Sequence, residues 1–451
     1  MNSILLIDHS GRGHAFADLF TRTNPTIQVY YAPGCSAITT DRVVSVPELK
    51  LSEPLELVQF AEKMHVDFAL VTNAGALANG VVDEFQRHQI PVIGPNKQAA
   101  RLEASKTYGK QFCAKYGIPT AEFQLFTDPQ LAQEYVRQVG YQVVIKADGL
   151  CDGNGSFVCD TVEDALHAID RIMIQRDFGD AGERIVIEKR LFGTEVLLFA
   201  ILDGQHALLL PTAMDYPKSD DGDQGVICGG MGSLSPHPLE HESLMQELRE
   251  QILQPLLHGI QCEQLSYTGI IYVGCMLVDG RAHVLEINAR MGDPEAESIL
   301  PRIESDFVAI CQSILTHTLD CQTLNLNRLH FCDIVATQGP TQQISNGKRK
   351  GWYKGWPYGR YGRSYPITGL DKVSLEQCKI FIGQATVLPD KGLVTDGGRP
   401  LHVVGFGANR EEAVVNAYAN IRHIHFNGIR YRSDIGSLLP MSQAKDNDRT
   451  N

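Results

Sequence analysis

Three polar residues at alternate positions could bind a metal ion and its anionic ligand. Glu286 and Asn288 lie in an apolar stretch typical of a β-strand, and Arg290 follows at the same spacing. Because strand side chains alternate, the three project to one side. Carboxylate and amide oxygens suit Mg²⁺, and a guanidinium can bind phosphate or carboxylate with two parallel hydrogen bonds. The pattern predicts a magnesium site beside an anion, although a solvated edge strand would have the same spacing.

Two glycine-rich loops could contact phosphate groups. Residues 149–155 follow a predicted buried strand at residues 142–146 and contain three glycines. Backbone N–H groups of such a loop can contact phosphate oxygens, and Lys146 can reach the same charges. A hairpin that needs glycine for its turns explains this loop equally well. The second loop, residues 220–232, is irregular, and loops of that kind inside a domain are usually functional or mobile.

The first hundred residues alternate short apolar strands with amphipathic helices. We expect strands at residues 4–7, 27–32, 68–71 and 91–94, and helices at residues 11–20, 54–65 and 81–88. This alternation is typical of a parallel, doubly wound sheet. Gly11 and Arg12 lie at the first strand–helix turn, where an anion could bind the helix N-terminus.

Length, composition and charge limit the class of protein. A chain of 451 residues with 43% hydrophobic and 21% charged residues should form about three globular domains. A net charge of −13 argues against nucleic-acid binding. No apolar run reaches membrane-spanning length, and the first residues are typical of a strand rather than a signal peptide. The 11 cysteines include no C-x-x-C pair, so we expect reduced thiols in the cytoplasm rather than a disulfide framework or a zinc site.

The composition changes after about residue 325. Residues 347–363 are basic, aromatic and rich in glycine, which indicates either an anion-binding loop or, as we prefer, a solvated turn region. Strands are expected again at residues 379–382 and 401–405, and a helix at residues 410–423. The polar tail, residues 439–451, is expected to be disordered.

The order of these motifs resembles the ATP-grasp superfamily and, within it, the phosphoribosylamine–glycine ligase family. The segments that carry the likeness are residues 94–95, 102–106, 144–150, 229–236, 267–269, 286–295, 394–399 and 424–436. The resemblance implies an α/β and α+β multidomain chain. Its expected parts are an N-terminal doubly wound domain (1–103), an ATP-grasp domain (104–325) with a mobile lid at about 118–192, a C-terminal α+β domain (326–438) and the tail (439–451).

The same resemblance implies roles for individual residues. ATP contacts are expected at Lys106, Lys146, Gly149, Gly153, Gly155, Glu188, Leu191 and Glu195. Glu286 and Asn288 would bind Mg²⁺ or Mn²⁺. Substrate contacts are expected at Gly11, Arg12, Asp215, Gly230, Met231, Gly232, Arg290, Asp293 and Arg399. Lys146 and Arg290 would also take part in catalysis.

The reaction implied by the resemblance is ADP-forming amide synthesis from small-molecule substrates. ATP would activate a carboxylate such as glycine as an acyl phosphate, and an amine would then displace phosphate. Positive charge from Mg²⁺ and lysines stabilises a transferring phosphoryl group, and the loop at residues 149–155 would close as a lid that keeps water out. We expect a monomer or homodimer without nucleic-acid or membrane partners.

The chain departs from the family pattern mainly where the amine substrate is expected. The family's G-R-E-H is Gly11-Arg-Gly-His14 here, its P-G-N is Pro33-Gly-Cys35, and its lid-loop lysine is Asn154. Each lost hydrogen bond is worth roughly 0.5–1.5 kcal/mol. Three interpretations therefore stay open: a phosphoribosylamine–glycine ligase with an altered pocket, a ligase of specialised metabolism that uses another amine, and a nucleotide-binding protein without catalysis.

Overall fold

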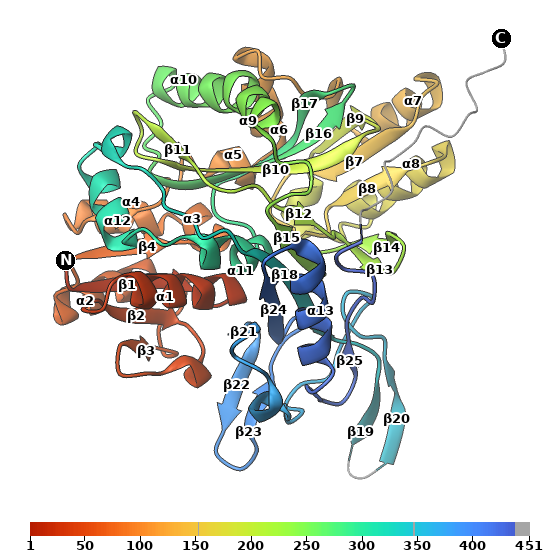
Figure 1. Ribbon diagram of the computed structural model, residues 1–451. Coiled ribbons are helices and arrows are strands. Elements are labelled where there is room, and N and C mark those ends of the chain that lie inside the picture. The colour runs from red at the N-terminus through yellow and green to blue at the C-terminus, as the bar shows by residue number, and fades with distance from the viewer. Residues whose placement is uncertain (152, 346–347, 438–451) are drawn as a thin grey trace.

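The N-terminal part of the chain is a parallel sheet covered by helices on both faces. The computed structural model describes residues 1–151, 153–345 and 348–437, and Figure 1 shows this sheet in red and orange. Its strands, in spatial order, are β3 (Val43–Ser45), β2 (Gln28–Pro33), β1 (Ser3–Asp8), β4 (Phe68–Val71) and β5 (Val92–Ile93). Its helices are α1 (Gly11–Thr23), α2 (Pro54–Met64), α3 (Ala74–Ala78) and α4 (Val81–Arg87). The predicted doubly wound fold is confirmed, with β3 as a strand that the sequence pattern had not indicated.

The alternation of side chains along β1 explains why helices cover both faces. Ile4 and Leu6 are buried in one cluster with Phe16 of α1, whereas Leu5 and Ile7 are buried in another cluster with residues of α2 and α4. Successive strand residues point to opposite faces, so an apolar run of this kind needs a helical layer on each side.

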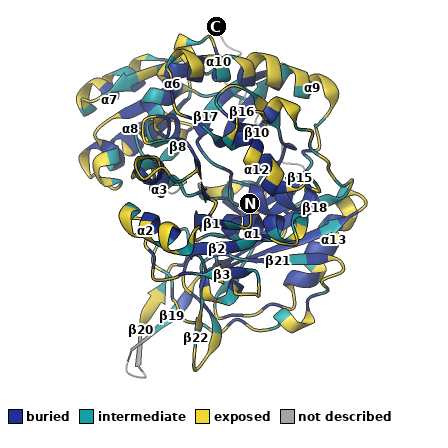
Figure 2. Cartoon of the chain, turned by 90° about the vertical axis from the view of Figure 1, so that its left-hand side faces the viewer, coloured by how far each residue is buried: buried dark blue, intermediate teal, exposed yellow. Residues whose placement is uncertain are grey.

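Two antiparallel sheets of four strands follow. The first contains β6 (Phe123–Phe126), β9 (Ile185–Lys189), β7 (Val143–Ala147) and β8 (Ser156–Cys159), and it packs with α7 (Pro129–Gln138) and α8 (Val162–Ile169). The second contains β11 (Ala207–Leu209), β10 (Thr194–Leu202), β16 (Gly269–Val278) and β17 (Arg281–Asn288). The helices that share its core are α5 (Arg101–Ala104), α6 (Lys106–Lys115), α9 (Glu242–Glu247) and α10 (Gln254–Cys262). Figure 2 shows that the strands are mostly buried while the outer sides of α7 and α9 are exposed.

The C-terminal sheet takes strands from two separate parts of the chain. Its order is β12 (Met214–Asp215), β15 (Gly232–Ser235), β18 (His330–Gln338), β24 (Leu401–Gly407) and β21 (Cys378–Ile382), with β25 (Ile429–Arg430) paired to β18 and α13 (Arg410–Ile421) packed on β18 and β24. β12 and β15 lie between strands of the ATP-grasp region in sequence, so that region contributes directly to this sheet.

Three hairpins complete this part of the fold. They are β13 (Lys218–Asp220) with β14 (Gln224–Ile227), β19 (Thr341–Ser345) with β20 (Lys348–Tyr353), and β22 (Ala385–Leu388) with β23 (Gly392–Thr395). The last two project from one end of the C-terminal sheet (Figure 1). The basic segment at residues 347–363 begins as β20, and Gly347 and the polar tail lie outside the described residues.

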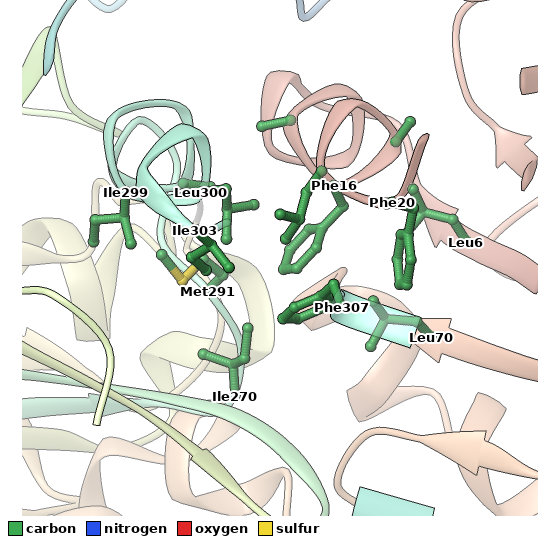
Figure 3. Close-up of a cluster of buried hydrophobic side chains, with 14 of the residues drawn as sticks. Leu6, Phe16, Phe20, Leu70, Ile270, Met291, Ile299, Leu300, Ile303 and Phe307 are labelled. Atoms are coloured by element: carbon green, nitrogen blue, oxygen red, sulfur yellow. The ribbon is translucent and has the colours of Figure 1, made fainter. Parts of the chain in front are cut away.

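An aromatic cluster fixes the N-terminal domain onto the segment that follows β17. The rings of Phe16 and Phe20 on α1 lie 6.0 and 5.3 Å from the ring of Phe307, which begins α12 (Phe307–Leu315). Leu300 and Ile303 pack against the same group, as Figure 3 shows. The start of α1 is therefore held beside the loop after β17. In the part of the chain that the structure describes, the helices are too short or too polar to cross a bilayer.

Candidate active site

A β-bulge in β17 orients the predicted metal ligands. Gly274 of β16 pairs with Glu286 and Cys275 pairs with Val284, so Leu285 is an extra residue without a partner on β16. The buried side chains on either side of the bulge are accordingly those of Val284 and Ile287, three positions apart instead of two. Without the bulge, strict alternation would place Val284 and Glu286 on the same face. The bulge thus buries Val284 while Glu286 stays partly open, with 32% of its side chain exposed.

Glu286 and Asn288 are in contact, and a lysine from another element joins them. The Asn288 amide Nδ2 donates to Glu286 Oε1 at 3.1 Å, and Lys106 Nζ lies 2.6 Å from Glu286 Oε2. Lys106 is the first residue of α6, which starts there because the Ser105 side chain accepts a hydrogen bond from Tyr108 N. Although desolvation opposes ionisation, Lys106 and Lys146 hold the pKa of Glu286 at about 2. A carboxylate and an amide oxygen side by side are hard donors that fit Mg²⁺.

Lys146 is positioned by the bulge and by a buried carboxylate. Its Nζ donates to Leu285 O at 2.8 Å, the carbonyl of the bulge residue, and lies 2.9 Å from Glu188 Oε1. Lys110 Nζ lies 2.8 Å from Glu188 Oε2. Although burial opposes ionisation, the two lysines keep the pKa of Glu188 below its usual range. We call Lys106, Lys110, Lys146, Glu188 and Glu286 the lysine cluster.

The structure gives less information on the other residues that are predicted to contact ATP. Both carboxylate oxygens of Glu188 face lysines, and its expected contact with ATP stays a prediction. Leu191 lies in the connection between β9 and β10, half-buried, and Glu195 is an exposed residue of β10. Partial loss of hydration, with Asp223 and Glu286 nearby, raises the pKa of Glu195 to about 7.

The two glycine-rich loops of the sequence meet in space. A β-carbon on Gly153 would lie 3.1 Å from the Gly229 α-carbon, and Gly153 has a φ of +80° that favours glycine. Gly149 and Gly155 are tightly packed as well, because a β-carbon there would approach Ala181 to 2.6 Å and Cys151 to 2.8 Å. Sequence reasoning treated these loops separately; their contact joins the predicted lid to the predicted substrate loop.

Arg290 lies between the lysine cluster and a second group of charges. Its Nη2 is 2.9 Å from Glu103 Oε1, and its Nη1 donates to Met291 O at 3.0 Å. Glu103 also accepts a hydrogen bond from Ala289 N at 2.8 Å. Glu103, which sequence reasoning missed, therefore holds both the side chain and the backbone of the segment after β17.

A buried network of charges surrounds the start of α1. Arg12 Nε donates to Asp8 Oδ2 at 2.8 Å, and Arg12 N donates to Asp293 Oδ2 at 3.4 Å. Arg399 Nη1 lies 2.8 Å from Asp293 Oδ1 and also contacts Gly229 O. The predicted substrate residues Gly11, Arg12, Asp293 and Arg399 are thus brought together from three parts of the chain.

Besides Asp8, three further residues of this network were not found from the sequence. His402 Nδ1 lies 2.8 Å from Asp333 Oδ2, and His402 Nε2 lies 3.6 Å from Glu297 Oε1. Although burial opposes protonation, Glu297 and Asp333 raise the pKa of His402 to about 9. Glu297 lies just two residues beyond the segment 286–295 that resembles the family, and this is the one signal near it in the sequence. We call Asp8, Arg12, Asp293, Glu297, Asp333, Arg399 and His402 the carboxylate cluster.

The remaining predicted substrate residues line the neighbouring strands. Asp215 ends β12, where burial and the nearby Glu295 and Glu195 raise its pKa well above the usual range. Gly230 has a φ of +89°, and a β-carbon there would collide with Pro294. Met231 is fully buried in the core of the C-terminal sheet, and Gly232 is buried at the start of β15. Their substrate contacts stay predictions, but the Met231 side chain packs into the core.

Tyr31 occupies the space beside the departure from the family pattern at Gly13. A β-carbon on Gly13 would collide with the ring and hydroxyl of Tyr31, which is fully buried on β2. The Tyr31 hydroxyl donates to Ser10 O at 2.8 Å. The missing carboxylate at position 13 is therefore matched by an aromatic ring that fills its place.

The arrangement of an N-terminal α/β domain, two antiparallel sheets and a C-terminal sheet defines an ATP-grasp protein. The same fold occurs in the biotin carboxylase domain of Hydrogenobacter thermophilus 2-oxoglutarate carboxylase, with a TM-score of 0.68 at 12% identity over 95% of this chain and 91% of that chain. More narrowly, the chain belongs to the phosphoribosylglycinamide synthetase family. Models of its N domain, ATP-grasp (A) domain and C domain match residues 2–103, 104–296 and 353–438. The predicted family and fold class are confirmed.

Individual relatives match over almost their whole length. The phosphoribosylamine–glycine ligase of Caldanaerobacter subterraneus subsp. tengcongensis is 35% identical over 436 residues, covering 96% of this chain and 99% of the relative. That of Escherichia coli O157:H7 is 35% identical over 434 residues, covering 96% and 97%. The crystal structure of phosphoribosylamine–glycine ligase from Thermotoga maritima has a TM-score of 0.79 at 28% identity and covers 96% of this chain and 100% of that chain.

Proposed function

We propose that this chain is an ATP-dependent, ADP-forming ligase that joins glycine to phosphoribosylamine, the reaction for which its relatives are named. The observation that carries the proposal is the meeting of Glu286 and Asn288 with Lys106. A carboxylate, an amide oxygen and an ammonium group from different elements are what a metal–nucleotide complex requires. A cytoplasmic location and a monomer or homodimer are part of the same proposal.

The chain's own residues supply binding and orientation. When bound, ATP supplies the phosphoryl group that activates the carboxylate, and Mg²⁺ or Mn²⁺ held by Glu286 and Asn288 neutralises phosphate charge. Lys106 and Lys146 add positive charge on the same side, and Glu188 holds Lys146 in place.

Arg290 is the proposed clamp for the carboxylate substrate. Its side chain is 20% exposed and its guanidinium is oriented by Glu103, so it can reach a ligand. Holding one anion beside another in a fixed geometry lowers the entropic cost of their encounter.

One observation favours a second candidate, a ligase of the same chemistry with a different amine. Tyr31 fills the space where the family's carboxylate at position 13 would project. A buried ring cannot replace the hydrogen bonds of a carboxylate, so the amine pocket of this chain differs from the family pattern.

Release of ADP from the purified full chain separates these functions. The assay supplies ATP, Mg²⁺ and glycine with phosphoribosylamine generated in the reaction, or with a panel of other primary amines. Turnover with phosphoribosylamine supports the first proposal, and turnover with another amine alone supports the second. A chain that binds ATP but releases no ADP with any pair is not a ligase for these substrates, and both proposals are then wrong.

A further inference from the structure

Three potential metal ligands meet in the carboxylate cluster. Asp293 follows β17, Glu297 lies on α11 (Glu295–Ile299), and His402 lies on β24. One ligand atom from each lies within 4.8 Å of the others. His402 Nε2 is 3.6 Å from Glu297 Oε1 and 3.7 Å from Asp293 Oδ1. A tetrahedral site with bonds of about 2.0–2.2 Å places its ligand atoms about 3.4 Å apart, so these separations fit a metal ion with little movement.

The histidine is already held as metal-binding histidines usually are. His402 Nδ1 lies 2.8 Å from Asp333 Oδ2, and the two residues occupy neighbouring strands of one sheet. When Nδ1–H donates to this carboxylate, Nε2 carries the lone pair and points at Glu297 and Asp293. Such a carboxylate–histidine pair fixes the ring and raises its basicity toward a metal.

Glu297 lacks the partners that a buried carboxylate needs. It is 0% exposed, and neither of its carboxylate oxygens has a hydrogen-bond partner among the residues that the structure describes. Burial of a polar group without such partners costs free energy unless a bond or a cation compensates. Glu297 Oε1 lies 3.6 Å from His402 Nε2, which is too far for a hydrogen bond and leaves space for a cation between the two atoms.

The charge balance of the carboxylate cluster is compatible with a divalent cation. Asp8, Asp293, Glu297 and Asp333 supply four carboxylates, while Arg12 and Arg399 supply two guanidinium groups. Arg12 is committed to Asp8 and Arg399 to Asp293. Among the described residues neither Glu297 nor Asp333 forms an ion pair with a guanidinium, and both face only the His402 ring, so a divalent ion in place of the ring proton would be compensated by two carboxylates.

The backbone leaves this space open. A β-carbon on Gly11 would lie 2.6 Å from His402 Nε2 and would also collide with Glu297 Oε1. Any residue with a side chain would therefore fill the face between the two ligands. Gly11 is a turn glycine in sequence, but its place beside these atoms gives it a second reason to lack a side chain.

We propose that Asp293, Glu297 and His402 bind one divalent transition-metal ion of the Zn²⁺ class, with Asp333 as a positioning residue. One imidazole and two carboxylates suit Zn²⁺ and its neighbours better than Mg²⁺ or Ca²⁺. The ion would join the C-terminal sheet to α11 beside the start of α1, and it would leave a fourth position for water or substrate. This site is separate from Glu286 and Asn288 and does not depend on the proposed ligase activity.

The test is zinc binding to the full chain without nucleotide. The protein is stripped with a chelator, desalted and titrated with Zn²⁺ at neutral pH, and bound metal is measured by calorimetry and elemental analysis. The wild type should bind one equivalent and melt at a higher temperature with Zn²⁺ than without it. Glu297→Gln and His402→Gln should lose this equivalent, and Asp333→Asn should weaken it about 10–100-fold.

Two controls distinguish the site from others in the chain. Glu286→Gln should still bind the equivalent. The exposed pair Cys262 and His258 on α10, with Sγ 3.5 Å from Nε2, is a potential surface site, and the variant Cys262→Ser with His258→Gln should also bind it.

A wild-type chain that takes up no zinc at micromolar concentration overturns the proposal. So does an equivalent that survives in Glu297→Gln and His402→Gln but disappears from the Cys262 and His258 variant. Should the first two variants fail to fold, the zinc K-edge absorption spectrum of the wild type decides: nitrogen and oxygen donors support the site, and sulfur contradicts it.

Discussion

The lysine cluster and the carboxylate cluster differ in the sign of their charge. The first has three ammonium groups against two carboxylates, and the second has four carboxylates against two guanidinium groups and the imidazole of His402. One segment contributes to both clusters. β17 supplies Glu286 to the first, and the loop and helix after β17 supply Asp293 and Glu297 to the second. A local excess of either charge attracts ligands of the opposite charge whatever the net charge of the protein. The first cluster can therefore bind nucleotide phosphates, while the second can bind a metal ion or a protonated amine.

The largest expected effect is on stability. Glu188→Gln should lower the free energy of unfolding by about 3–5 kcal/mol, because it leaves Lys110 and Lys146 buried with one partner fewer. Glu297→Gln in chelated protein should cost less than about 1 kcal/mol, because its carboxylate has no hydrogen bonds to lose. Urea unfolding of both variants measures the difference. Equal losses would mean that the two clusters do not differ in charge balance.

The next effect concerns turnover. Glu286→Gln should lower kcat about 100-fold at a fixed Mg²⁺ concentration, because an amide replaces the charged ligand. Raised Mg²⁺ should restore part of the loss. Glu134→Gln, at an exposed position of α7, is the matched control and should leave ADP release unchanged. Near-normal turnover of Glu286→Gln would reject the metal assignment.

A third prediction tests the remodelled pocket. Gly13→Ala should destabilise the protein by about 1–3 kcal/mol, because its β-carbon collides with Tyr31. Combined with Tyr31→Ala, the same change should cost much less than the sum of the two single variants. Thermal or urea unfolding of the four proteins gives this coupling. Additive losses would show that Tyr31 does not fill the place of the missing side chain.

The smallest effect is expected in the lid loop. Asn154→Lys should tighten ATP binding several-fold, because an added charge near phosphates is worth about 1 kcal/mol. Calorimetry with a non-hydrolysable ATP analogue measures it, with Asn154→Gln as the uncharged control. Unchanged affinity in both variants would place this loop away from the phosphates.

Local patterns predicted the fold better than they predicted the site. Alternating strands and helices in the first hundred residues and the polar trio at the end of β17 are signals that adjacent residues carry, and the structure has both. The pairing of His402 with Asp333 joins residues 69 positions apart, and no local pattern contains it. Met231 was selected because it lies in a glycine-rich motif, but its side chain is buried in the core, which the motif does not indicate.

Tertiary contacts also explain the domain arrangement that the sequence pattern missed. β12 and β15 are short and lie in a glycine-rich stretch, so their periodicity is too brief to identify strands. β15 gains its hydrogen bonds from β18, about one hundred residues later, and β12 pairs in turn with β15. Only the completed sheet stabilises them.

The unpaired Leu285 has a consequence for how this site tolerates a deletion. Removal of that one residue would make Val284 and Glu286 neighbours in the strand, so strict alternation would keep Glu286 and Asn288 opposite the side where Val284 is buried. Lys146 would at the same time lose the carbonyl that anchors it. A single codon deletion would thus leave both ligands on their side of the strand and release only the lysine beside them.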